Sequence, residues 1–425
     1  MRRRDLLKSA TFAVATQALG SVAIAAEPLP AQANGTKRLG KIALEEHFMV
    51  PEFVPYFEET YPNISPALPS LALAALQDFG DHRIEVMDQN GVDYSVLSLS
   101  GPGVQIEKDS AVAVKRARWI NDFLAKEIQK RPTRYGGLAH LAMQNPAEAA
   151  NELERCIHDL GFQGAMINGQ TNGEYLDLDK FSAFWERAAA LDAPIYIHPG
   201  NPVDHPAMYA GHPELWGPVC SWAFETGTHA LRLVFAGVFE RYPSARVILG
   251  HMGETLPLNL WRFDSRWPIS HRGSMTLPQQ PSFYIRRNIA ITTSGVCSDV
   301  SLRCALDSMG AGNVMFSIDY PFEKTPVAAA FIENARITET ERQQVASGNA
   351  KRILKITRPI GPSAQPLLVH AACQKAAIDH QRLARHKRRS VRRQINRRAD
   401  QLFRLAKAPH RRAQQQLLPA WRAVQ

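Results

Sequence analysis

A regular alternation of short apolar runs and amphipathic stretches between residues 41 and about 357 limits the possible folds most strongly. Near-continuous apolar strands separated by helices are typical of a parallel sheet that helices cover. Eight such units in one stretch of chain are the number found in a closed barrel. We therefore expect an α/β fold, a (β/α)8 TIM barrel, over residues 41–357. The predicted strands are Lys41–Glu45, Tyr94–Ser98, Tyr135–Ala139, Gln163–Ile167, Pro194–Ile197, Arg246–Gly250, Asn288–Thr292 and Val314–Ile318.

Helical patterns lie between these runs, and glycines and prolines mark the joints. The clearest patterns cover Ala147–Leu160, Asp179–Leu191, Ala223–Tyr242 and Val327–Ala335. The sequence has no Walker-type phosphate loop and no G-x-G-x-x-G after its first strand, so no nucleotide-binding motif competes with the barrel prediction.

The N-terminal segment has the pattern of an export signal. Residues 1–25 combine the basic run Arg2-Arg3-Arg4, an uncharged small and apolar stretch, and small residues at the expected cleavage site. The order R-R-x-L-L-K resembles the twin-arginine signal. We expect a signal peptide at 1–25, a linker at 26–40, and a periplasmic or otherwise exported protein. No other apolar stretch is long enough to span a membrane, so we expect no membrane span.

The positive charge belongs to the two ends of the chain. The net charge is +10, yet residues 361–425 hold 15 basic and 2 acidic side chains, and residues 26–360 hold 31 against 37. The body therefore offers no basic surface for nucleic acid. We read 358–425 as a basic, poorly ordered tail. There are two alternatives: the tail forms a basic amphipathic helix that binds an acidic surface, or it is sequence without function.

Ionisable side chains follow four of the predicted strands. Glu45 and His47 lie at the end of the first strand and share one side of an extended chain. His198, His251 and Asp319 follow the fifth, sixth and eighth strands. Because a barrel carries its active site at the carboxyl ends of its strands, we expect these groups to meet at one rim.

Two carboxylates, Glu45 and Asp319, and two imidazoles, His47 and His198, could hold one divalent cation. This mixed oxygen and nitrogen set suits Zn²⁺ or Mn²⁺ and leaves positions open for substrate. The fourth strand ends without a lysine that could bridge two metal ions, so we expect one ion.

Several motifs together resemble the decarboxylases of the amidohydrolase superfamily, and among them the γ-resorcylate (2,6-dihydroxybenzoate) decarboxylases. They are the opening 41-KIALEEHF-48, the turn 197-IHP-199, 249-LGHMGE-254, 317-SIDYPFE-323 and the closing 349-NAKRIL-354. The E-x-H start is the discriminating motif. The resemblance covers about residues 40–357 and implies a TIM barrel of the metal-dependent hydrolase type. Residues 51–78, rich in proline, depart from the family and should form part of a lid.

The resemblance also implies roles for residues outside the predicted metal ligands. His251 and Glu254 match a polar pair beside the metal that holds substrate and solvent. Arg262 matches an arginine that, in the family, assists the site of a neighbouring subunit, which implies a homo-oligomer, a dimer or tetramer. Asn168 and Phe322 match pocket positions, although a turn amide and simple packing explain these two residues equally well.

The expected reaction is the non-oxidative decarboxylation of a small aromatic carboxylic acid, an ortho-hydroxybenzoate. Our hypothesis is that Asp319 protonates the ring carbon that bears the carboxylate, and that His251 and Arg262 hold the substrate oxygens. The same site could instead activate water and hydrolyse a lactone or an amide. A binding protein that uses the basic tail is a third possibility, which the ionisable rim groups disfavour.

Overall fold

The computed structural model describes residues 38–60, 67–203, 206–270 and 277–362. The predicted signal peptide, most of the linker and all but the first residues of the predicted tail lie outside these ranges. Eight parallel strands follow one another around a single sheet, as the sequence predicts. Their bounds are β1 Lys41–Phe48, β2 Val92–Leu99, β3 Tyr135–His140, β4 Gly164–Asn168, β5 Ile195–His198, β6 Val247–Leu249, β7 Ile289–Thr292 and β8 Val314–Met315.

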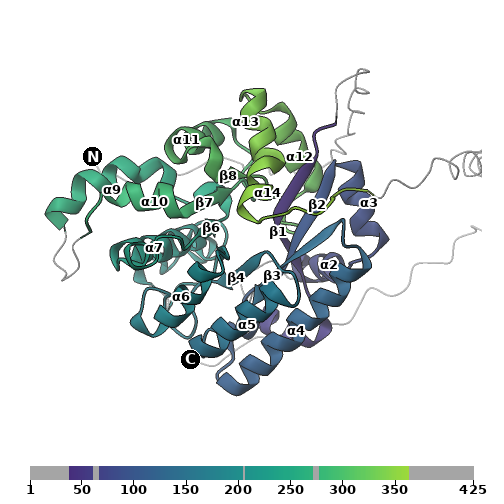
Figure 1. Cartoon of the computed structure of the whole chain (residues 1–425), viewed down its shortest axis with the longest axis horizontal. Coiled ribbons are helices and arrows are strands. Elements are labelled where there is room, and N and C mark those ends of the chain that lie inside the picture. Colours follow the sequence, from purple (N-terminus) through teal and green to yellow (C-terminus); the bar gives the residue numbers. More distant parts are fainter. Residues whose placement is uncertain (1–37, 61–66, 204–205, 271–276, 363–425) are drawn as a thin grey trace, which may run out of the picture. The chain divides into compact units, whose positions relative to one another are not determined.

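Helices cover the outside of the strands (Figure 1). Several of them begin with a capping residue or a proline at the first turn. Asp109, for example, accepts hydrogen bonds from the N–H groups of Ala111 and Val112 at the start of α4. The helices are α1 Val54–Thr60, α2 Ala67–Leu76, α3 Asp81–Gln89, α4 Ser110–Lys130, α5 Pro146–His158, α6 Ser182–Ala190, α7 Ser221–Phe235, α8 Val238–Arg241, α9 Leu256–Ser270, α10 Pro281–Asn288, α11 Asp299–Met309, α12 Thr325–Asn334, α13 Glu339–Gln343 and α14 Asn349–Ile353.

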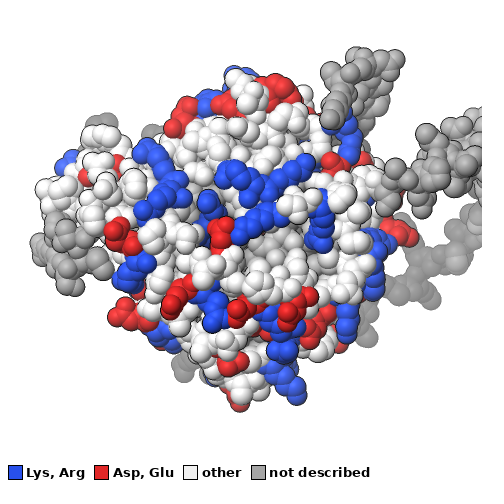
Figure 2. All heavy atoms as spheres, in the orientation of Figure 1, with Lys and Arg blue, Asp and Glu red and all other residues white. Residues whose placement is uncertain are grey.

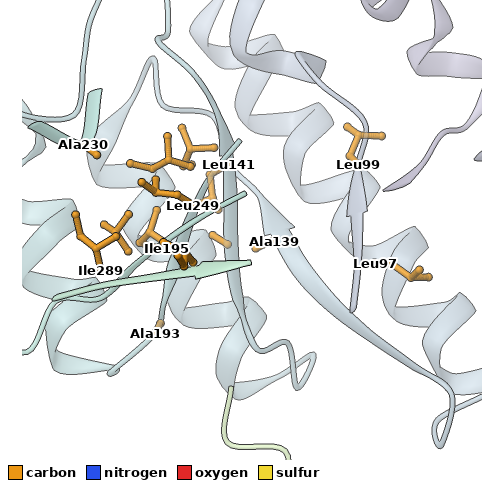
Figure 3. Packing of buried hydrophobic residues seen from close by; sticks show 14 of the residues in the cluster. Leu97, Leu99, Ala139, Leu141, Ala193, Ile195, Ala230, Leu249 and Ile289 are labelled. Carbon is orange, nitrogen blue, oxygen red and sulfur yellow. The ribbon is translucent and has the colours of Figure 1, made fainter. Parts of the chain in front are cut away.

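The core consists of apolar strand residues packed against the surrounding helices. Leu97 on β2, Ile195 on β5 and Leu249 on β6 are fully buried and belong to this cluster (Figure 3). Burying a side chain of this size stabilises the fold by about 1.5–3 kcal/mol. The apolar runs therefore form the rigid frame that positions the polar residues at the strand ends.

The eight-stranded barrel prediction is confirmed, and three details differ. β8 ends at Met315 instead of Ile318, so Asp319 lies beyond the strand and not directly after it. β1 continues to Phe48, so Glu45 and His47 lie within the strand rather than at its end. The single helix predicted over Ala223–Tyr242 is wrong: α7 ends at Phe235 and α8 begins at Val238. Gly237 separates them with a φ of 71°, a left-handed conformation that ends a right-handed helix.

Charged side chains of both signs are interspersed on the face of the molecule that Figure 2 shows. None of the helices within the described ranges is both long and apolar enough to cross a membrane.

Candidate metal centre and active site

β1 supplies two of the predicted metal ligands through an irregularity in its pairing. Its register with β2 advances three residues, from Ala43 to Glu46, while β2 advances only two, from Ser95 to Leu97. Such a bulge re-aims the side chains that follow it and is common beside active sites. Glu45 and His47 both turn toward the same centre, and both are fully buried.

The two ligand imidazoles are oriented by contacts at their Nδ1 atoms. His198 ends β5, and its Nδ1–H donates to the carbonyl of Pro199 at 3.0 Å. Ser98 Oγ lies 3.2 Å from His47 Nδ1. Both Nε2 atoms therefore face the centre. There His198 Nε2 lies 3.4 Å from Glu45 Oε1, and His47 Nε2 lies 3.3 Å from Asp319 Oδ1. Burial lowers the pKa of His198 well below its usual value, which keeps the imidazole neutral, as a metal ligand requires.

Asp319 follows β8 in a strained backbone conformation. Its φ is 77°, which side-chain-bearing residues rarely adopt, and its carbonyl accepts hydrogen bonds from the N–H groups of Phe322 and Glu323 at 2.8 and 3.0 Å. Burial raises the pKa of Asp319, but the neighbouring imidazoles of His251 and His47 outweigh that effect and lower it. Asp319 is therefore an ionised carboxylate in the site.

Buried polar atoms without partners show that these four residues fit a cation. Among the described residues, Glu45 Oε1, His47 Nε2 and Asp319 Oδ1 have no hydrogen-bond partner, although each is shielded from solvent. One ligand atom from each of Glu45, His47, His198 and Asp319 lies within 4.8 Å of the others. Leaving such atoms unpaired is costly, and a single divalent ion would satisfy all of them at once. The set suits Zn²⁺ or Mn²⁺.

His251 and Glu254 form a polar pair beside this centre. His251 Nδ1 lies 2.9 Å from Glu254 Oε1, and its Nε2 lies 3.6 Å from Asp319 Oδ2 and 3.9 Å from Glu45 Oε1. Burial alone would lower the pKa of His251, but Glu45 and Glu254 raise it well above its usual value. His251, Met252 and Glu254 all have positive φ angles, and strain of this kind gathers at functional sites.

A cavity of about 420 Å³ opens onto the centre. His198, His251, Glu254 and Asp319 line its polar end. No lysine or arginine lies among its described lining residues, and His251 is the basic side chain at its polar end. Its other lining residues are mostly apolar and include Phe57, Ala72, Pro218, Trp222, Val296 and Phe322. Phe57 and Ala72 come from the segment predicted to form part of a lid.

The structure brings together seven of the nine predicted site residues. Phe322 lines the cavity, with its ring centroid 5.7 Å from that of His47. Asn168 ends β4 and is buried, but it does not line the cavity; its Oδ1 lies so close to Gly101 that a Cβ there would be at 2.7 Å. Arg262 is exposed on α9 and lies outside this chain's own cavity.

Tyr196 is a site residue that the sequence reasoning missed. Its hydroxyl donates to Glu45 Oε2 at 2.6 Å and lies 2.9 Å from Thr292 Oγ1. Burial raises the pKa of this phenol well above its usual value, so it stays a donor. Tyr196 stands two residues before His198 on the same strand, and the two-residue period of a strand places both on one side. That period could have identified it.

Comparisons with known proteins agree with this geometry. The chain matches the amidohydrolase family over residues 47–356. A γ-resorcylate decarboxylase from Polaromonas sp. (strain JS666) is 41% identical over 338 residues, which cover 75% of this chain and 99% of that protein.

Two solved structures share the fold. A 2,6-dihydroxybenzoate decarboxylase in complex with 2,6-dihydroxybenzoate superposes with a TM-score of 0.71 at 38% identity, covering 75% of this chain and 99% of the other. A dihydroxybenzoic acid decarboxylase from Polaromonas sp. JS666 with bound manganese and the inhibitor 2-nitroresorcinol has a TM-score of 0.71 at 40% identity, covering 75% and 98%. The chain therefore belongs to the amidohydrolase family, and within it to the decarboxylases that include the γ-resorcylate decarboxylases.

Proposed function

We propose that this protein is a metal-dependent carboxy-lyase that removes CO₂ from an ortho-hydroxybenzoate of the 2,6-dihydroxybenzoate or salicylate type. The observation that carries the proposal is the juxtaposition of the Glu45, His47, His198 and Asp319 cluster with a histidine of raised pKa, His251, at the polar end of one apolar cavity. The decarboxylases reported above support the substrate class.

The chain's own residues bind and orient the aromatic acid. When bound, the divalent cation supplies Lewis-acid stabilisation for the substrate's carboxylate and ortho-phenolic oxygens. Phe322 and the apolar wall pack against the ring and exclude water from it. Protonated His251, held by Glu254, donates a hydrogen bond to the anionic oxygens.

The reaction needs one proton at the ring carbon that bears the carboxylate. Protonation of that carbon lets the carbon–carbon bond break, after which its electron pair restores the aromatic ring and CO₂ leaves. We assign the delivery of this proton to Asp319. Asp319 is ionised in the free site, so it must gain this proton after the anionic substrate binds, because a nearby negative charge raises the pKa of a carboxyl. His251 Nε2, which lies 3.6 Å from Asp319 Oδ2, can supply it, and solvent then reprotonates His251. The hydrolytic alternative is not favoured, since the relatives and structural neighbours reported above are decarboxylases.

A substrate panel tests the proposal. We expect manganese- or zinc-loaded protein to convert one or more ortho-hydroxybenzoates to the corresponding phenol with equimolar CO₂, and to leave para-hydroxybenzoate unchanged. Asp319→Asn should lower kcat by roughly 10²–10⁴-fold, the usual contribution of a positioned acid. Metal content is measured for each variant, because Asp319 is also a predicted ligand. Ring opening of a lactone with uptake of water, and no CO₂, would instead establish the hydrolase.

We further propose a homo-oligomer in which Arg262 serves the cavity of a neighbouring copy. Arg262 lies on α9 among large exposed apolar side chains: Leu258, Trp261 and Ile269 are 81%, 75% and 74% exposed. Several large apolar side chains exposed on one helix are typical of a protein interface.

Mixing variants tests the Arg262 assignment. Arg262→Ala and Asp319→Asn homo-oligomers should each be inactive, and co-expressed mixed oligomers should regain activity. Arg266→Ala, an exposed arginine on the same helix, is the control and should stay active. A monomer in light scattering, or an active Arg262→Ala homo-oligomer, would contradict the assignment.

We also propose that the twin-arginine-type signal exports the protein to the periplasm. The sequence pattern of residues 1–25 supports this proposal, and those residues lie outside the described ranges. Replacing Arg3 and Arg4 with lysine should retain the full-length precursor in the cytoplasmic fraction, whereas the unchanged chain should appear, shortened, in the periplasmic fraction. An unprocessed cytoplasmic wild type would refute the proposal.

A further inference from the structure

Glu46 stands between two metal-ligand residues in the sequence but faces away from them. Its neighbours Glu45 and His47 turn toward the metal centre, whereas Glu46 is not a member of that cluster. It is only 3% exposed. It lies beside Arg83 and Met87 of α3, and beside Ile318 and Tyr320 of the segment after β8, around a cavity of about 10 Å³. A buried carboxylate in such a place needs specific partners.

The partners of Glu46 belong to the segment that carries Asp319. Glu46 Oε1 accepts a hydrogen bond from the backbone N–H of Ile318 at 3.1 Å and another from Ser317 Oγ at 3.4 Å. Ser317 Oγ in turn accepts from the backbone N–H of Glu45 at 2.7 Å. All three hydrogen bonds join β1 to Ser317 and Ile318, the residues directly before Asp319.

These side-chain links lie where the barrel has little backbone pairing. β8 is only two residues long, and the hydrogen-bonded ladder runs from β1 to β8 through the other strands. Between β1 and the segment after β8, the structure shows a bridge at Glu46 and Tyr320, with the His47 N–H donating to the Tyr320 carbonyl at 2.8 Å. Glu46 and Ser317 therefore reinforce the closure of the barrel next to the metal centre.

Arg83 holds the same junction from the outer layer. Its guanidinium donates to the carbonyl of His47 at 2.6 Å and to that of Ala75 at 3.1 Å. The guanidinium carbon also lies 4.6 Å from the centroid of the Tyr320 ring. The Arg83 guanidinium thus contacts both the backbone of His47 on β1 and the side chain of Tyr320, the residue after Asp319.

We propose that Glu46 is a positioning residue that sets the distance between the two β1 ligands, Glu45 and His47, and Asp319 in the segment after β8. Three of the four ligands lie on the two segments that it joins, and His198 comes from β5 across the barrel. Loss of the Glu46 carboxylate would free the Ile318 N–H and the Ser317 hydroxyl, and would let the Asp319 segment move away from β1. The metal would then be held less tightly.

The affinity for Mn²⁺ tests this role, because it is measured on the full chain without any substrate. Glu46→Ala should weaken Mn²⁺ binding about 10- to 100-fold in calorimetric titration, the usual effect of losing a group that orients metal ligands. It should also change the electron paramagnetic resonance spectrum of bound Mn²⁺. Glu46→Gln keeps an oxygen that accepts from Ile318 and should restore most of the affinity. Failure of the proposed decarboxylation would leave this test unaffected.

Two further variants separate positioning from general stability. Glu152, on α5, is a buried carboxylate that accepts from Asn121 and Arg155 away from the site, so Glu152→Ala should lower the Tm without changing the affinity for Mn²⁺. Ser317→Ala removes one hydroxyl and should weaken Mn²⁺ binding even if Glu46→Ala does not fold. Wild-type Mn²⁺ affinity in folded Glu46→Ala, or in Ser317→Ala when Glu46→Ala is unfolded, would overturn the proposal.

Discussion

Gly250, the residue before His251, leaves room for the side chain of Glu45. A Cβ at this position would lie 2.6 Å from Glu45 Oε2 and 3.2 Å from the hydroxyl of Tyr196. Neither neighbour can yield easily, because Tyr196 and Glu45 are hydrogen-bonded to each other in a fully buried site. The glycine is therefore required by the close approach of a metal ligand.

Gly250→Ala should displace Glu45 and weaken metal binding by roughly 10- to 100-fold, as expected when the surroundings of a ligand are disturbed. Isothermal titration with Mn²⁺ measures this directly. Gly312→Ala is a suitable control, because the nearest atom to its Cβ, in the guanidinium of Arg352, would lie at an ordinary 3.6 Å. Equal affinities in the two variants would show that Glu45 tolerates the added methyl group.

Glu225 on α7 makes stability depend on pH. Burial raises the pKa of its carboxyl from 4.5 to about 8. The folded state therefore binds this proton more tightly than the unfolded state does. The contribution of Glu225 to stability is fully present below the unfolded pKa and is lost as the pH rises toward the folded pKa.

We expect Glu225→Gln to reduce the loss of unfolding free energy between about pH 5 and pH 8, by up to about 1.4 kcal/mol for each pH unit. Urea titrations at several pH values give the slope for each variant. Glu148→Gln, which replaces an exposed carboxyl, should keep the wild-type slope. An unchanged slope in Glu225→Gln would mean that this carboxyl is ionised in the folded protein.

At the scale of elements, apolar runs in the sequence predict the positions of the strands well, but they do not predict local backbone geometry. All eight strands occur where the sequence placed them, because each run must be buried between helices and its neighbours. The cluster of Glu45, His47 and His198 follows from strand period and strand ends. The left-handed backbone at Asp319 and the outward position of Arg262 depend on tertiary packing, which residue patterns do not encode.

The break between α7 and α8 gives an element-scale prediction. At Gly237, with its φ of 71°, any other residue is strained, so Gly237→Ala should lower the free energy of unfolding by about 1–2 kcal/mol. Chemical denaturation measures the change, and Gly312→Ala, without a positive φ, serves as the comparison. A stabilised Gly237→Ala variant with added helical circular dichroism would favour one continuous helix instead.

At the scale of the whole molecule, metal binding is coupled to folding. The four ligand residues span positions 45 to 319 and meet only when the barrel is closed. A cation present at 100 times its Kd should stabilise the folded state by about 2.7 kcal/mol. We expect a chelator to lower the Tm and Mn²⁺ to restore it. In the Glu45→Ala variant, neither the chelator nor Mn²⁺ should change the Tm. If the chelator leaves the Tm of the wild type unchanged, the protein holds no tightly bound ion.

The charged groups at the polar end of the cavity have a consequence for the release of the product. In the proposed reaction an anion enters and a neutral phenol remains once CO₂ has escaped. The electrostatic attraction that binds the anionic substrate is lost with its carboxylate, because a neutral phenol is not held by charge. The carboxylates of Glu254 and Glu323 in the lining do not attract it either. Loss of the carboxylate therefore promotes release of the product, and the reverse carboxylation requires a high concentration of bicarbonate.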